Sequence, residues 1–138
     1  MRIYKIVLVI FCSSLFIRCS VDNDDDKTEF LYDLVKIEEV DIPDEFVEDD
    51  TYTIIISYFR PSDCHSFFGF DSVQSDNEIS VAVVNVYVEE ESCSELNDSE
   101  LIEESFDFTV GSRDSYVFNF WQSEDEFLTI EVPVIENN

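Results

Sequence analysis

The sequence predicts an all-β fold, an antiparallel β-sandwich of about seven strands. Apolar and polar residues alternate along short segments through most of the chain, which is the period of a strand with one buried face. The chain has only 2 glycines and 3 prolines, so the turns between these segments rely largely on Asp, Asn and Ser. No segment after the first two dozen residues has a comparable helical period, and 94–104 would form at most a short helical turn.

The first two expected strands, 34–42 and 51–59, are each closed by a proline. Pro43 and an acidic pair follow the first strand, and Pro61 follows the second. In the second strand every other residue is apolar, which predicts one inward face. That face carries Tyr52, Ile54, Ile56 and Tyr58.

The third and fourth expected strands, 65–73 and 79–88, break the simple alternation. Three phenylalanines crowd the third strand around Gly69, where a β-bulge would accommodate an extra residue. In the fourth strand the apolar positions change parity near Val83. This change predicts either a bulge there or a strand that is buried on both faces.

The last three expected strands, 101–110, 115–121 and 127–134, alternate cleanly. A turn at Gly111 separates the first two of them, and Pro133 predicts an edge position or the end of pairing. The side chains expected to point inward are Phe106, Phe108, Val110, Tyr116, Phe118, Phe120, Leu128, Ile130, Val132 and Val134.

Asp114, Ser115 and Tyr116, at the head of the sixth strand, resemble the tyrosine corner of immunoglobulin-like domains, in which the hydroxyl caps a neighbouring backbone group. An ordinary core tyrosine is the alternative. Phe118 stands where an antibody-type domain has its second inter-sheet cysteine. The resemblance therefore implies an immunoglobulin-like sandwich in which an apolar contact replaces that disulfide.

The first 18 residues predict an export signal in the form of a signal helix. Arg2 and Lys5 precede an apolar run at 6–17, which has the size of a secretory signal core. At about 1.5 Å per residue such a helix spans roughly 18 Å, whereas the hydrocarbon core of a bilayer is roughly 30 Å thick. The run is therefore expected to direct export and not to remain as a membrane span.

The segment LFIRCS at 15–20 resembles the cleavage box of bacterial lipoproteins, in which the cysteine becomes the new N-terminus and carries acyl chains. Arg18 stands where that box normally has a small residue, and Cys12 is the rival cysteine. The acidic run at 22–26 further resembles lipoproteins of Bacteroidota, in which it is associated with transport to the outer face of the outer membrane. The resemblance implies palmitate-type lipidation of Cys19 and a cell-surface location. An ordinary cleaved signal peptide or an uncleaved leader is the alternative.

The chain thus divides into a lipoprotein signal peptide (1–18), an acidic tether (19–30) and one β-sandwich domain (31–138). The segments IPDEF, TYTIIISYFRPSDCHSFFGF and SYVFNFW also resemble small lipoproteins of Bacteroidota that have a single β-sandwich domain. That resemblance implies no particular activity.

The composition is that of a folded and very acidic protein. Hydrophobic residues make up 45% of the chain, which is too many for a disordered segment, and 33 acidic residues oppose 7 basic ones. This charge disfavours nucleic acid and anionic membrane surfaces as partners. A well-solvated acidic surface is the simplest interpretation, and basic partners or divalent cations stay open.

The cysteine count predicts one disulfide. Cys12 would leave with the leader and Cys19 would carry lipid, so Cys64 and Cys93 remain as a pair. In an oxidising compartment such a pair is expected to bridge. A metal site at Cys64 and His65 is the alternative, but the sequence offers few further thiol or imidazole ligands, and we expect no metal and no cofactor.

The sequence shows no motif for catalysis. A Ser-His-Asp arrangement would need His65, the only histidine, as its base, and no G-x-S-x-G motif accompanies it. Carboxylate pairs arise by chance in so acidic a chain. A small hydrolase is therefore the weakest of the functional hypotheses, and we expect no enzyme.

The remaining candidate site is aromatic. Rings at Phe67, Phe68 and Phe70 cannot all point into one core if the strand alternates, and Trp121 lies at the end of its strand. We interpret these four residues as candidate ligand contacts, and burial on both faces is the alternative. The sequence therefore predicts a lipid-anchored envelope protein that acts as a structural or binding module, or captures an envelope protein or glycan through 67–70.

Overall fold

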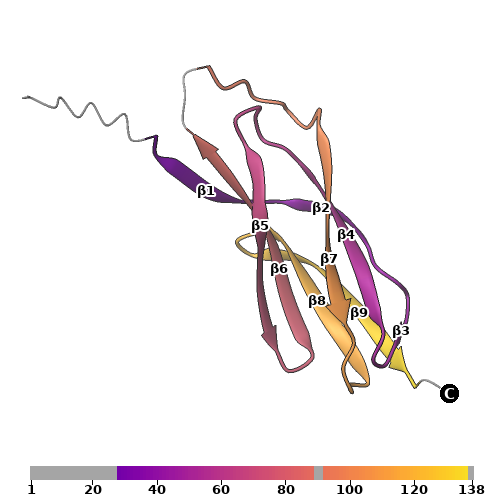
Figure 1. Cartoon of the computed structure of the whole chain (residues 1–138). Coiled ribbons are helices and arrows are strands. Elements are labelled where there is room, and N and C mark those ends of the chain that lie inside the picture. Colours follow the sequence, from indigo (N-terminus) through magenta and orange to yellow (C-terminus); the bar gives the residue numbers. More distant parts are fainter. Residues whose placement is uncertain (1–27, 89–91, 137–138) are drawn as a thin grey trace, which may run out of the picture.

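The computed structural model describes residues 28–88 and 92–136, and these form nine strands and no helix (Figure 1). The prediction of an all-β sandwich is confirmed. The predicted signal peptide and most of the tether lie outside the described residues. The strands are β1 (Phe30–Val35), β2 (Ile37–Asp41), β3 (Phe46–Val47), β4 (Thr51–Phe59), β5 (Ser66–Ser75), β6 (Glu78–Val88), β7 (Leu101–Thr109), β8 (Ser115–Ser123) and β9 (Glu126–Ile135).

Two sheets enclose the core. One has six strands in the order β1-β6-β8-β9-β3, with β5 also paired to β6, and the other has three in the order β2-β4-β7. One edge of β6 pairs with β5, and its other edge pairs with β1 at 83–88 and with β8 at 78–81. β6 is therefore the centre of a fork, with β1 and β8 following one another along the same edge. Within the described residues no helix is long and apolar enough to cross a membrane.

The structure divides the first expected strand into two. The segment 34–42 breaks at Lys36: the residues before it belong to β1 in the six-stranded sheet, and those after it form β2 in the other sheet. Two pairings are parallel, β6 with β8 and β3 with β9, whereas the sequence predicted antiparallel strands throughout. The first follows from the connection, because the chain crosses to the other sheet as β7 and returns in the direction of β6.

A bulge in β5 resolves the irregular patterns of β5 and β6. Phe67 lies opposite Asn85 and Gly69 lies opposite Val84, so Phe68 is the extra residue. This confirms the bulge expected near Gly69. The parity of β6 does not switch, because the disturbance lies in its neighbour, and the inward side chains of β6 are Ile79, Val81, Val83 and Asn85.

Aromatic and aliphatic side chains from both sheets fill the core. The largest of those that are almost wholly buried are Tyr58, Phe46, Phe118, Phe120, Ile37, Ile54 and Ile56. Tyr116 adds the expected corner, because its hydroxyl accepts a hydrogen bond from the backbone N–H of Gly111 at 2.9 Å. A Cβ on Gly111 would lie 2.9 Å from that hydroxyl, so the corner requires a glycine there.

Tyr116→Phe should lower the free energy of unfolding by about 1 to 3 kcal/mol, because the partly buried N–H of Gly111 would lose its acceptor. Urea unfolding monitored by circular dichroism measures this loss. Tyr52→Phe is the matched control, since its hydroxyl accepts the N–H of Val47 at 3.0 Å from a more exposed position and should cost less. A Tyr116→Phe protein as stable as the parent would remove the corner from the account of stability.

Candidate functional site

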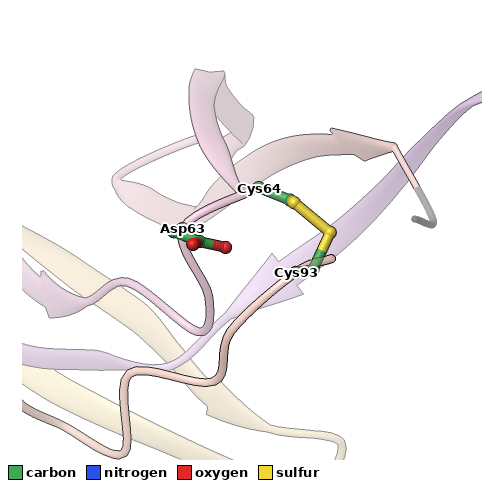
Figure 2. Close-up of side chains that lie close together, drawn as sticks. All are labelled: Asp63, Cys64 and Cys93. Carbon is green, nitrogen blue, oxygen red and sulfur yellow. A yellow bond between two sulfur atoms is a disulfide. The ribbon is translucent and has the colours of Figure 1, made fainter. Parts of the chain in front are cut away.

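Two loops meet at the end of the domain where β5 begins. Residues 60–65 and 92–100 run side by side, with hydrogen bonds from Asp63 N to Ser94 O (3.1 Å) and from Leu96 N to Pro61 O (3.1 Å). The disulfide between Cys64 and Cys93 joins them, with Cα atoms 5.6 Å apart (Figure 2). This is the pairing that the sequence predicts.

The metal alternative has little support at this disulfide. Asp63 lies beside the two sulfurs, and ligand atoms of the three residues fall within 4.8 Å of one another (Figure 2). The bonded sulfurs offer no thiolate, and the Asp63 carboxylate accepts the backbone N–H of Ser94 at 2.8 Å. Asp63 therefore caps the neighbouring loop. The described residues hold no other trio of His, Cys, Asp and Glu arranged for a metal.

His65 lies in line with a serine and an aspartate. Its Nδ1 is 2.7 Å from Ser62 Oγ, and its Nε2 is 3.4 Å from Asp33 Oδ2. The ring stacks on Tyr87 with centroids 4.5 Å apart. A hollow of about 230 Å³ beside the disulfide includes Ser62, His65 and Tyr87 in its lining. The fold thus brings together the three residue types of a hydrolytic triad.

The serine of this group is held by its own turn. Ser62 is only 6% exposed, its carbonyl accepts the N–H of His65, and its hydroxyl accepts the N–H of Cys64 at 3.2 Å. A nucleophile has to reach a substrate carbonyl, and these contacts direct the Ser62 hydroxyl toward its own backbone. The geometry accounts for the group as a network that orients His65 and fixes the turn before β5.

A polar pair lies next to this network on the inner face. Asn85 is fully buried and stands opposite Asp33 in the pairing of β6 with β1. Both side-chain polar atoms of Asn85, together with Asp33 Oδ1, form no hydrogen bond within the described part of the chain. Buried polar atoms of this kind are commonly satisfied by ordered water. Asn85 also ends the apolar series that β6 presents to the core.

The outer side of the six-stranded sheet carries a continuous apolar surface. Cross-strand pairs join Phe30 to Val88, Tyr32 to Val86 and Leu34 to Val84. We call this surface the outer apolar face, and it consists of Phe30, Tyr32, Leu34, Phe68, Val73, Val84, Val86, Val88, Trp121 and Phe127.

Its most exposed rings belong to β1 and β5. Phe68 is 62% exposed, Phe30 60% and Tyr32 55%. The bulge turns Phe68 outward, and its ring meets that of Tyr32 edge-on with centroids 4.9 Å apart. Gly69, which follows in β5, adds no side chain, and a Cβ there would meet nothing within 4 Å. The rings of Tyr32 and Phe68 are therefore exposed to solvent, and no side chain at Gly69 covers them.

The structure separates the four predicted contact residues. Phe68 and Trp121 lie on the outer apolar face, as the aromatic hypothesis requires. Phe67 and Phe70 are a correction, because both pack against the core. The bulge is the physical reason. In a regular strand Phe67 and Phe70, three residues apart, would face opposite sides, but the extra residue at the bulge brings both rings to the inner face while Phe68 points outward.

β1 and β9 also contribute to this face, which the sequence did not predict. Phe30 and Tyr32 belong to a part of β1 that precedes the strand expected at 34–42, and Phe127 was not expected to be a contact residue. Alternation of Phe30, Tyr32 and Leu34 was the available signal. This alternation indicates an apolar outer face only because the paired strand β6 presents Val84, Val86 and Val88 on the same side.

Acidic residues dominate the rest of the surface. The basic residues of the described ranges are Lys36, Arg60 and Arg113. Each forms an ion pair with a carboxylate: Lys36 with Glu38, Arg60 with Glu100 and Arg113 with Asp76. Within these ranges the carboxylates far outnumber the cations that could neutralise them.

The chain matches no protein-family model, no curated protein and no solved structure. Its function is therefore inferred from the residues and their geometry.

Proposed function

We propose that this chain is a lipid-anchored, non-catalytic binding module of the cell envelope that captures a protein partner through the outer apolar face. The observation that carries the proposal is the exposure of Phe30, Tyr32 and Phe68 together on one sheet face. Contiguous apolar patches on a folded protein mark interaction surfaces, and aromatic residues dominate the energetics of such surfaces. A surface that served only to keep the protein solvated would not account for these exposed aromatic rings.

Charge defines the class of partner. With 33 acidic residues in the chain and the described cations paired, the field around the outer apolar face is negative. Interfaces commonly combine an apolar centre with a polar rim, and complementary rims speed association and exclude wrong partners. The expected partner is a protein with an apolar patch bordered by lysine and arginine.

The proposed location is the outer membrane, with the domain at the cell surface. The export signal, Cys19 and the acidic run at 22–26 support it, and the self-repelling tether would hold the domain away from the bilayer. A single acyl chain holds only marginally, so the two or three chains of a lipoprotein cysteine would give a stable anchor. β1 begins at the opposite end of the domain from the end of β9 (Figure 1).

Cys19→Ser should abolish the incorporation of labelled palmitate and release the protein from the membrane fraction. Intact mass of the extracted parent protein should show a chain that begins at Cys19 with acyl chains added. Cys12→Ser is the matched control and should leave both results unchanged. A parent chain without added lipid would refute the anchor.

The binding surface can be tested in cells with a photo-crosslinking amino acid placed at position 68 of the full chain. We expect crosslinks to protein from this position, because the ring of Phe68 is exposed and lies against the exposed ring of Tyr32. Position 101 is the matched control, since Leu101 is also exposed but lies on the other sheet. Equal crosslinking from both positions would contradict the proposal, and crosslinks from 68 to lipid or glycan alone would replace the protein partner.

Once the partner is identified, affinity gives the quantitative test. Tyr32→Ser with Phe68→Ser should raise Kd by roughly 30-fold or more, since central aromatic residues contribute about 2 kcal/mol or more. Leu101→Ser should change it little. An unchanged affinity in the double variant would show that the partner binds elsewhere.

A further inference from the structure

The outer apolar face contains a hollow where β6 carries its two smallest outward side chains. Ser80 and Ala82 form part of a depression of about 150 Å³. On the β5 side, Val73 lies opposite Ser80 and Asp71 lies opposite Ala82. On the other edge of β6 the hollow lies where the pairing with β1 ends and the pairing with β8 begins.

Apolar side chains form most of the wall. Leu34 comes from β1, Trp121 from β8 and Phe127 from β9, where Phe127 pairs with Trp121. Leu34 also continues the row that contains Tyr32. The hollow therefore belongs to the outer apolar face and adjoins its exposed rings.

Asp71 gives the hollow a charge. It is the only ionisable residue in the lining, and it is exposed. In the ranges 28–88 and 92–136, Lys36, Arg60 and Arg113 are all paired with other carboxylates. No described cation of this chain therefore neutralises Asp71.

We propose that this hollow receives a basic side chain, lysine or arginine, from the partner, an inference that rests on the proposed function. Lysine and arginine each combine an apolar stem with a cationic head, and the hollow combines apolar walls with one carboxylate. A cation near an indole or phenyl ring gains a further electrostatic attraction, which is strongest for tryptophan. Anionic ligands are disfavoured by Asp71 and by the acidic surface around it.

The single tryptophan makes the hollow observable. Because Trp121 is the only tryptophan of the chain, its fluorescence reports on this place alone when it is excited selectively. The full chain in detergent is titrated with Nα-acetyl-lysine amide and Nα-acetyl-arginine amide, whose side chains keep their positive charge. N-acetyl-norleucine amide, which has an apolar stem and no charge, is the matched probe. We expect a saturable change with the two basic probes and a much weaker one with norleucine.

Variants separate the hollow from the general acidity of the protein. Asp71→Asn should weaken binding of the basic probes by about three- to fivefold, from the loss of one partly screened charge pair. Ala82→Val should weaken it as well by filling the floor. Glu103→Gln, which removes an exposed charge from β7 of the other sheet, should change it less than about twofold.

The outcomes distinguish this inference from the proposed function. Equal losses in Asp71→Asn and Glu103→Gln, or equal binding of norleucine and lysine probes, would overturn the basic-side-chain pocket. Absence of probe binding together with protein crosslinks from position 68 would overturn the pocket alone. Probe binding without such crosslinks would support the pocket and overturn the capture of a protein partner.

Discussion

Replacing Cys64 or Cys93 by serine should lower the free energy of unfolding by about 3 to 4 kcal/mol, because the bridge closes a loop of 29 residues in sequence separation. The loss arises mainly in the unfolded chain, which gains freedom when the loop opens. Urea unfolding of each variant measures it. The parent protein under a reductant should show a loss of the same size.

The double variant is the control for the pairing. Once one cysteine is absent the other has no partner, so the double variant should be no less stable than either single variant. Additive losses would mean that the two residues stabilise the protein separately. The loops themselves should stay paired near the bridge, because Asp63 N to Ser94 O and Leu96 N to Pro61 O are hydrogen bonds that do not require the sulfurs.

The local sequence predicted those strands in which the apolar alternation and the flanking turn-forming residues indicate the same boundaries. The strand expected at 51–59 coincides with β4, since alternation runs along it and turn-forming residues flank it. The break at Lys36 escaped prediction because both halves of 34–42 favour a strand, and only the choice of partner sends β1 and β2 to different sheets. β3 has two residues, and its parallel partner β9 is remote in sequence.

The candidate site shows the same division between local and distant information. The cysteine count led to the disulfide, and the crowding of rings led to Phe68. A bulge reverses the face to which every later residue of its strand points. Its exact position therefore determines that both Phe67 and Phe70 point inward. The approach of Ser62 and Asp33 to His65 combines a local turn with a distant strand, and a sequence with many serines and aspartates cannot specify such a meeting.

Phe118→Ala should lower the free energy of unfolding by about 3 to 5 kcal/mol. Phe118 is fully buried in β8, and its ring lies 5.2 Å from that of Phe108 in β7 and 6.1 Å from that of Phe46 in β3, between centroids. Phe108 belongs to the other sheet, so this contact joins the two sheets. Truncation would remove the contact and leave a cavity that rigid strands fill only in part.

Phe68→Ala is the matched control for that truncation. It removes the same atoms from a ring that is 62% exposed, so it should cost less than about 1 kcal/mol. Comparable losses in the two variants would mean that Phe118 does not join the sheets as its contacts indicate. The expected difference identifies what holds this sandwich together: an aromatic contact between the two sheets at Phe118, and the disulfide between the loops at one end. Phe68 would then contribute little to the stability of the fold, so its exposed ring is available to bind a partner.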